Sequence, residues 1–308
     1  MQFYLAPMQG ITGFIYRNVH HKYYDGVDKY YSPFVVTNMK AHRRNKELHD
    51  VLPERNLNVP LIPQLLSSNA KELVVYADFL YENGYKEVNL NCGCPSNMVA
   101  GKGRGAGMLA DLNRLEAFLD EVFAAGPKPQ ISIKTRLGMN DALDFPEILE
   151  IYNKYPLTEL IVHARTRKDM YRPGTVDREA FKAAAGNSRC PVCYNGDLFS
   201  KEDIDAFAGE FPMVGAVMCG RGLLERPWLA SEYKGGEGYE PERLKAFHEE
   251  LYEEYLIDCP DKRSAVMQMK EMWCYLRKTF PERSDITSKI LRSRTPEEFE
   301  ENSKRFFE

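Results

Sequence analysis

The sequence of 308 residues predicts an α/β fold, a (β/α)8 TIM barrel followed by a small C-terminal all-helical domain. Eight short apolar runs recur up to about residue 220, and segments with helical spacing separate them. This alternation is typical of parallel strands joined by crossover helices, and eight such units favour a closed barrel over a doubly wound sheet. After about residue 226 the strand-like runs stop. We therefore expect a barrel over residues 1–238 and a helical domain over residues 239–308.

Each expected strand is a short run that ends in a polar or glycine-bearing turn. In chain order the runs are QFYLAP (2–7), YYSPFVV (30–36), LIPQLL (61–66), EVNLN (87–91), ISIKTR (131–136), LIVHAR (160–165), VCYNG (192–196) and AVMCG (216–220). Helical spacing predicts helices at 69–83, 111–125, 144–154, 177–185 and 201–208. Beyond a linker marked by GGEG and Pro241, residues 265–278 combine apolar residues at helical spacing with basic ones. They predict an amphipathic helix in the C-terminal domain.

Composition limits the partners of the chain. A net charge of −4 argues against wholesale binding of polyanions, yet residues 262–294 hold nine Lys/Arg against three Asp/Glu, which indicates a local basic face. No window reaches the roughly 18 apolar residues of a membrane span. The N-terminus MQFYLAPMQG lacks the features of an export signal, so we expect a cytoplasmic protein whose seven cysteines are reduced.

Five polar residues stand at the carboxyl ends of expected strands, where barrel enzymes place their chemistry. Alternation along the strands gives the polar side chains of the fourth and fifth strands one common face, opposite the apolar ones. We therefore expect the five to meet at the barrel mouth. They are Gln64, Asn91, Lys134, His163 and Asn195.

The turns after the seventh and eighth strands predict a phosphate site. They read YNGDL (194–198) and CGRGLL (219–224). Barrels often bind phosphate at these two turns through backbone N–H groups. Glycine permits close approach of the backbone, and Arg221 adds a permanent cation with bidentate reach. A phosphorylated ligand is expected here.

A stretch rich in glycine and cysteine, residues 87–109, follows the fourth strand. Its glycines do not match a dinucleotide fingerprint or a P-loop. Its CGC and the later CPVC are not a spaced pair of CxxC motifs, so no metal is predicted. Cys92 and Cys94 remain as a possible acid or nucleophile, with inert buried thiols as the alternative. Of the two, Cys94 is expected to be the more exposed.

Taken in order, seven motifs resemble one family. They are LAPMQGIT, PQLL, NLNCGCPS, IKTRLG, VHARTR, YNGD and MCGRG, between residue 5 and about 225. The combination is similar to that of the tRNA-dihydrouridine synthases. The resemblance implies an FMN-containing barrel with a helical tRNA-binding domain, which reduces the C5–C6 double bond of chosen uridines with NADPH.

The resemblance also implies residue roles. Cys94, immediately before a proline, is expected to donate the proton to C5, although an exchange of roles with Cys92 stays open. Cofactor contacts are expected from Pro7, Met8, Gln9, Gln64, Lys134 and His163 around the flavin ring, and from Asn195, Gly196, Asp197, Gly220 and Arg221 around its phosphate. Substrate contacts are expected from Asn91, Lys102 and Arg165, and from Lys270 and Arg277 in the basic tail. The glycine-rich loop is expected to close over the extruded base and to position Cys94.

Two other functions are compatible with these residues. One is an FMN-dependent barrel reductase of a free pyrimidine or another small conjugated substrate. The second is a non-catalytic RNA-binding or zinc-dependent module. A monomer is expected in either of the enzymatic cases, and the sequence predicts neither the uridine position nor a preference for NADPH over NADH.

Overall fold

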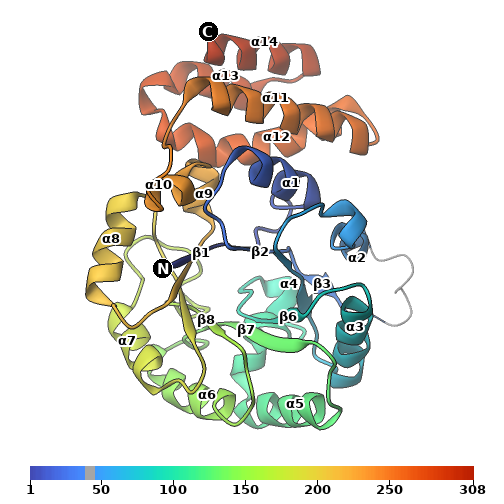
Figure 1. Cartoon of the computed structure of the whole chain (residues 1–308), viewed down its shortest axis with the longest axis vertical. Helices are drawn as coiled ribbons and strands as arrows, with labels where there is room; N and C mark the ends of the chain where they lie inside the picture. The colour runs from blue at the N-terminus through green and yellow to red at the C-terminus, as the bar shows by residue number, and fades with distance from the viewer. Residues whose placement is uncertain (39–45) are drawn as a thin grey trace.

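A barrel of parallel strands forms the centre of the molecule (Figure 1). In the computed structural model, which describes residues 1–38 and 46–308, the strands make one sheet in the order β3-β5-β6-β7-β8-β9-β10-β1-β2-β4. All of its strand pairs are parallel. The unbroken strands are β1 (Gln2–Leu5), β6 (Glu87–Cys92), β7 (Gln130–Arg136), β8 (Leu160–His163), β9 (Val192–Asn195) and β10 (Ala216–Cys219).

Two of the expected strands are each split at a proline. β2 (Lys29–Tyr31) and β3 (Val35–Val36) flank Pro33, whereas β4 (Leu61–Ile62) and β5 (Gln64–Leu66) flank Pro63. Proline has no N–H to give to the ladder, which interrupts the strand. β2 pairs with β4 and β3 pairs with β5, so each split strand still runs beside the other along its length. β3 and β4, the two ends of the strand order, therefore belong to two split strands that lie side by side. The sheet closes on itself, which confirms the predicted TIM barrel.

Helices cover the outside of the barrel and begin at capping side chains. The side chains of Asn69 and Asp111 accept hydrogen bonds from the backbone N–H three residues on, and Ser200 forms a capping box with Asp203. The five predicted helices are present with ends shifted by less than one turn: α3 (Ala70–Glu82), α5 (Leu112–Ala124), α6 (Phe145–Tyr152), α7 (Arg178–Asn187) and α8 (Lys201–Glu210). Further helices of the barrel are α1 (Phe14–Tyr23), α2 (Lys46–Asp50), α4 (Asn97–Ala100), α9 (Arg221–Glu225) and α10 (Leu229–Tyr233).

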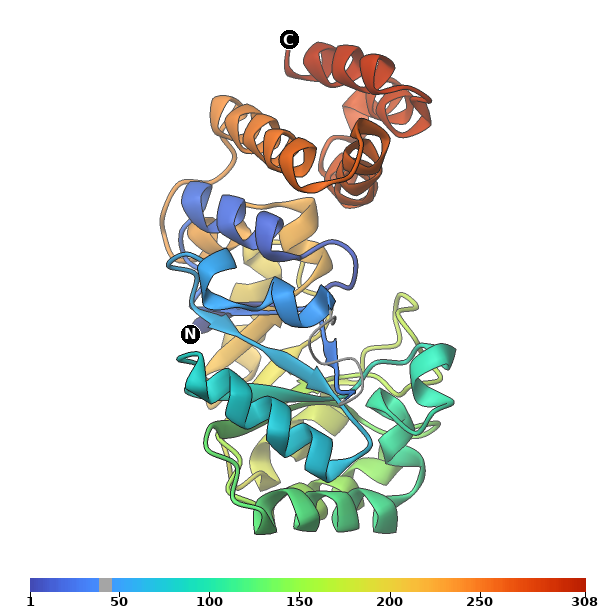
Figure 2. The same cartoon turned by 90° about the vertical axis from the view of Figure 1, so that its right-hand side faces the viewer.

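The C-terminal part of the chain is helical, as expected, and packs on the outside of the barrel against α1 and α9 (Figures 1 and 2). It consists of α11 (Pro241–Asp258), α12 (Lys262–Leu276), α13 (Ser284–Arg292) and α14 (Pro296–Phe307). Its core holds Trp273, which is fully buried and whose Nε1 donates to Nε2 of His248 at 3.1 Å. The division predicted at residues 238/239 falls in the connection between α10 and α11.

Alternation along the strands separates the barrel interior from the outer shell. In β1, Tyr4 belongs to a small buried cluster inside the barrel, whereas Phe3 and Leu5 belong to the large core between strands and helices. Residues of the same parity as Tyr4 in the other strands therefore point inward, and those near the carboxyl ends reach the mouth. No helix in the described part of the chain is long and apolar enough to span a membrane. Within those residues, no group of three or more His, Cys, Asp or Glu is arranged to hold a metal.

Candidate active site

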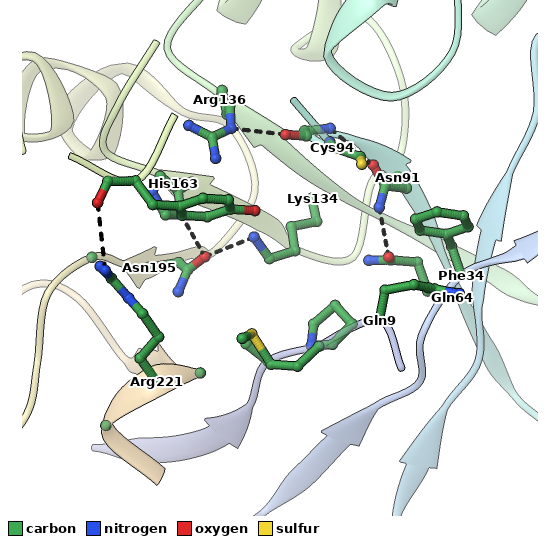
Figure 3. A pocket seen from close by; sticks show the side chains of 18 of the residues that line it. Gln9, Phe34, Gln64, Asn91, Cys94, Lys134, Arg136, His163, Asn195 and Arg221 are labelled. Atoms are coloured by element: carbon green, nitrogen blue, oxygen red, sulfur yellow. Dashed lines mark hydrogen bonds between the residues drawn. The ribbon is translucent and has the colours of Figure 1, made fainter. Parts of the chain in front are cut away.

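The carboxyl ends of the strands enclose a pocket of about 380 Å³ (Figure 3). This volume falls in the usual range for sites of small molecules and cofactors. All five polar strand-end residues predicted to converge line it. Other expected residues in its wall are Pro7, Met8, Gln9, Cys94, Gly196, Gly220 and Arg221. Residues that the sequence reasoning did not assign are Ala6, Phe34, Gly93, Arg136, Tyr171, Leu198, Phe199, Gly222 and Tyr275.

A chain of amides forms one wall. Asn91 Nδ2 donates to Gln64 Oε1 at 2.7 Å, and Gln64 Nε2 donates to Asn89 Oδ1 at 2.8 Å. Asn91 Oδ1 accepts from the backbone N–H groups of Gly93 at 3.1 Å and Cys94 at 2.9 Å. The side chain at the end of β6 therefore fixes the turn that carries the pocket thiol.

The two cysteines of β6 and its turn lie on opposite sides of the strand. Cys94 is half-buried and lines the pocket. Cys92 is fully buried in the outer core, where its sulfur lies 3.8 Å from Sδ of Met108, and burial raises its pKa to about 12. A thiol held in this environment is inert. Of the two thiols, only Cys94 can reach a molecule in the pocket.

The glycine-rich segment supports Cys94 from behind rather than lying as an open flap. Residues Gly105–Ala110 form a largely buried 3-10 helix, and Ala106 N donates to the carbonyl oxygen of Cys94 at 3.0 Å. A Cβ on Gly105 would lie 2.9 Å from that oxygen, and φ at this residue is +55°. Glycine is therefore required on both counts. This contact with Cys94 agrees with the positioning expected of the segment, and its closure over a base stays a prediction.

The neighbouring wall, from β7 to β9, gathers a cation, an imidazole and an amide. Lys134 Nζ donates to Asn195 Oδ1 at 2.7 Å, His163 Nδ1 lies 3.0 Å from the same oxygen, and Asn195 Nδ2 donates to the carbonyl of Met218 at 2.8 Å. Burial, followed by the positive charge of Arg136, lowers the pKa of Lys134 to about 7. An anionic ligand beside Lys134 would therefore stabilise the charged ammonium and raise its pKa.

His163 is neutral at physiological pH. Burial, together with the nearby Arg136 and Lys134, holds its pKa well below the usual range. Because the partner of Nδ1 is the acceptor oxygen of Asn195, the hydrogen resides on Nδ1. Nε2 then carries the lone pair and faces Nη1 of Arg165 at 3.4 Å.

One carboxylate bridges two arginines at the end of the pocket formed by β9 and β10. Asp197 accepts from Arg165 Nη1 at 3.1 Å and also from Arg221 Nη2. Arg221 lines the pocket, whereas Arg165 is fully buried behind the wall. The backbone is close here, since a Cβ on Gly222 would lie 2.2 Å from the carbonyl oxygen of Leu198. Arg221 and closely packed backbone therefore form this end of the pocket, which is the expected anion-binding end.

Arg136 is the main omission of the sequence reasoning. It is 1% exposed, and its guanidinium donates to the carbonyls of Gly93 at 2.8 Å, Thr166 at 2.9 Å and Met170 at 2.9 Å. It also lies 4.9 Å from the ring centroid of Tyr171. Arg136 thus ties the turn before Cys94 to the loop after β8. Its parity with Lys134 was the signal that could have identified it.

Five expected site residues do not line the pocket. Asp197 and Arg165 lie behind Arg221 and His163 and bond to them, and the direct ligand contact expected of both residues stays a prediction. Lys102 is exposed outside the pocket. In the helical domain, Arg277 is exposed, whereas Lys270 is half-buried and donates to the carbonyl of Ser293. The RNA contacts expected of Lys270 and Arg277 stay predictions, although the ammonium of Lys270 already has a partner inside the domain.

Comparison with known proteins agrees with the resemblance of the motifs. The family model described as dihydrouridine synthase matches residues 4–305, which is nearly the whole chain. The chain belongs to the dihydrouridine synthase family. It is therefore an oxidoreductase, and the family expected from the seven motifs is confirmed.

Individual relatives extend over both the barrel and the helical domain. A Shigella flexneri protein named tRNA-dihydrouridine(16) synthase is 30% identical over 93% of this chain and 92% of its own length. A protein of the same name from Haemophilus ducreyi is 29% identical over 92% of this chain and 88% of its own. A solved structure of morphinone reductase in complex with tetrahydroNAD superposes with a TM-score of 0.51 at 13% identity, covering 78% of this chain and 88% of that one. That likeness supports the barrel fold of this dihydrouridine synthase family member.

Proposed function

We propose that this chain is a tRNA-dihydrouridine synthase that uses FMN and NADPH to reduce the C5–C6 double bond of a uridine in tRNA. The observation that carries the proposal is the placement of the Cys94 thiol in a pocket that Lys134 also lines and whose β9–β10 end holds Arg221. A proton donor, a cation for developing negative charge and an anion-binding end are the parts that this reaction needs.

The residues present fit a flavin mononucleotide. Arg221, Gly196 and Gly220 would hold the phosphate, at the turns where barrels commonly bind one. Lys134, Gln64 and the Pro7–Gln9 turn would hold the ring, because the ammonium and amide hydrogens can donate to ring nitrogen and carbonyl oxygen atoms. When bound, the flavin supplies the hydride. The pKa of Lys134 is low, and an electron-rich flavin ring beside this residue would stabilise its protonated form.

Cys94 would complete the reduction. Hydride addition at C6 of uracil leaves enolate-like charge over C5, C4 and O4, and C5 must then take up a proton. The Cys94 thiol gives that proton and is reprotonated from solvent through the pocket mouth. Asn91 and Arg136 hold the turn that carries the thiol, so they fix the direction from which the proton arrives.

The RNA would be bound by the pocket rim and the helical domain. Inside folded RNA the target base is stacked, so it must leave the stack to enter the pocket. Arg277 is exposed on the helical domain and is the better of the two predicted backbone contacts there. We further propose uridine 16 as the target, because the two relatives named for that position match across the helical domain as well as the barrel.

NADPH as the hydride source, which the family resemblance implies, a monomeric state and a cytoplasmic location stay predictions, and the preference between NADPH and NADH stays open. Oligomeric state is measurable by light scattering of the purified protein at several concentrations. Nucleotide preference follows from the ratio of kcat/KM for NADPH and NADH, at a fixed concentration of RNA.

The test uses the purified protein with tRNA lacking dihydrouridine. We expect flavin absorbance, NADPH oxidation that depends on the tRNA, and dihydrouridine at position 16 by primer-extension mapping. Free uridine at the same concentration is the control substrate and is expected to be inert. Turnover of free uridine without turnover of tRNA would instead establish the small-molecule reductase, and reduction at another tRNA position would reject position 16 alone.

A further inference from the structure

The end of the pocket beside Arg221 is completed by a residue of the helical domain. Tyr275, near the C-terminal end of α12, lines the pocket together with Arg221 and Gly222 of α9. Its side chain is half-buried, and burial raises its pKa while the positive charge of Arg221 opposes this rise. The phenol is therefore within electrostatic reach of the cation at the anion-binding end.

Contacts just after Tyr275 fasten the helical domain to α9. Lys278 Nζ lies 2.7 Å from Glu225 Oε1 and 5.4 Å from the ring centroid of Tyr275. Thr279 Oγ1 donates to the carbonyl of Glu225 at 2.6 Å. Glu225 is the last residue of α9, and Arg221 is its first. The short helix that presents Arg221 to the pocket is thus held at its other end by the domain that supplies Tyr275 (Figure 1).

We infer that Tyr275 is a cofactor-binding residue whose hydroxyl donates to the phosphate of the bound flavin, with Thr279 and Lys278 as its positioning residues. This inference rests on the proposed use of FMN. A phosphate monoester carries a charge of about −1.5 to −2 at neutral pH. Asp197 already balances much of the charge of Arg221, so neutral donors must supply further hydrogen bonds.

The position of Tyr275 favours the cofactor phosphate over the RNA. Arg221, whose charge acts on Tyr275, follows β10 and lies across the pocket from Cys94 and Asn91, which belong to β6 and its turn (Figure 3). The uridine is proposed to bind beside Cys94. The helical domain consequently has a second role besides RNA binding, because retention of the flavin depends on its contact with α9.

Flavin binding without RNA or NADPH tests this directly. The flavin is removed from the full-length protein, and dissociation constants for FMN and for riboflavin, which lacks the phosphate, are measured by fluorescence quenching. We expect Tyr275→Phe to weaken FMN binding about tenfold, the worth of one good hydrogen bond to a charged group, and to leave riboflavin binding within about twofold. Thr279→Val should give a smaller loss of the same kind. Lys289→Met, which removes an exposed charge on α13, is the control and should change neither constant.

Three results would overturn the inference. Equal losses of FMN and riboflavin affinity in Tyr275→Phe would mean that the phenol shapes the pocket without meeting the phosphate. Unchanged FMN affinity with a raised KM for tRNA would assign Tyr275 to the RNA. If the unaltered protein bound neither flavin, the proposed function would be wrong as well, which separates that failure from the other two.

Discussion

Replacement of the two neighbouring cysteines separates catalysis from packing. Cys94 is half-buried in the pocket wall, so Cys94→Ala removes a sulfur without opening a core cavity and should change the free energy of unfolding by less than about 0.5 kcal/mol. It removes the proposed proton donor, and loss of general acid catalysis slows a step by about 10²–10⁴-fold. Cys92→Ala does the reverse. It empties part of a packed core, which costs roughly 1–2 kcal/mol of stability, and leaves the pocket intact.

The assay follows the two half-reactions separately. Bleaching of the flavin absorbance on addition of NADPH reports the first half-reaction, which needs no thiol, and both variants should keep the rate of the unaltered protein within about threefold. Dihydrouridine formed in a single turnover with tRNA reports the second, and we expect Cys94→Ala to lose about 10²–10⁴-fold there. A greater loss in Cys92→Ala than in Cys94→Ala would refute the assignment of the acid and the geometric reasoning behind it.

Three further changes test other parts of the site. Lys134→Met should stabilise the flavin-free protein by about 1–2 kcal/mol at pH 6.5. The pKa of the Lys134 ammonium is about 7 in the folded protein and about 10.4 in the unfolded chain, so the stability of the unaltered protein rises with pH between these values. The melting temperature of the variant should lack that rise. Asn195→Leu removes the acceptor shared by Lys134 and His163, and urea unfolding should show a loss of about 2–3 kcal/mol; an unchanged midpoint would contradict the network. Gly222→Ala should weaken FMN binding about tenfold because its Cβ would meet the Leu198 carbonyl at 2.2 Å, whereas Gly215→Ala, with open space around its Cβ, should not.

The barrel was predictable because strand-like runs alternate with helical segments, and the pocket wall was predictable because polar side chains share one parity along the strands. Asn91 and Lys134 share the inward parity of their strands, and the structure places them in one pocket, as expected. The same rule applied to Cys92 would have placed it with Val88 and Leu90 in the outer core, which decides which thiol faces the ligand. The expected strands over 30–36 and 61–66 were too long. They were predicted from hydrophobic character, which does not show that a proline interrupts the hydrogen bonds between strands.

Contacts between residues far apart in the sequence could not be predicted. Tyr275 reads as part of an amphipathic helix, and its place in the pocket depends on how α12 rests on the barrel, which no local pattern encodes. The bond between the ammonium of Lys270 and the carbonyl of Ser293 was hidden for the same reason, because it depends on how α12 packs against the segment after α13. The pairing of Asp197 with two arginines was hidden as well, because both arginines follow neighbouring strands.

The amide oxygens of Asn91 and Asn195 are each taken by two protein donors. An oxygen with both lone pairs engaged has nothing left to offer an incoming molecule. Toward a bound molecule, Asn91 and Lys134 can still offer hydrogen, from the second N–H of Asn91 and from the ammonium of Lys134. A carbonyl oxygen such as O4 of uracil can accept these hydrogens, whereas the exocyclic amino group that cytosine carries at the same ring position can only donate.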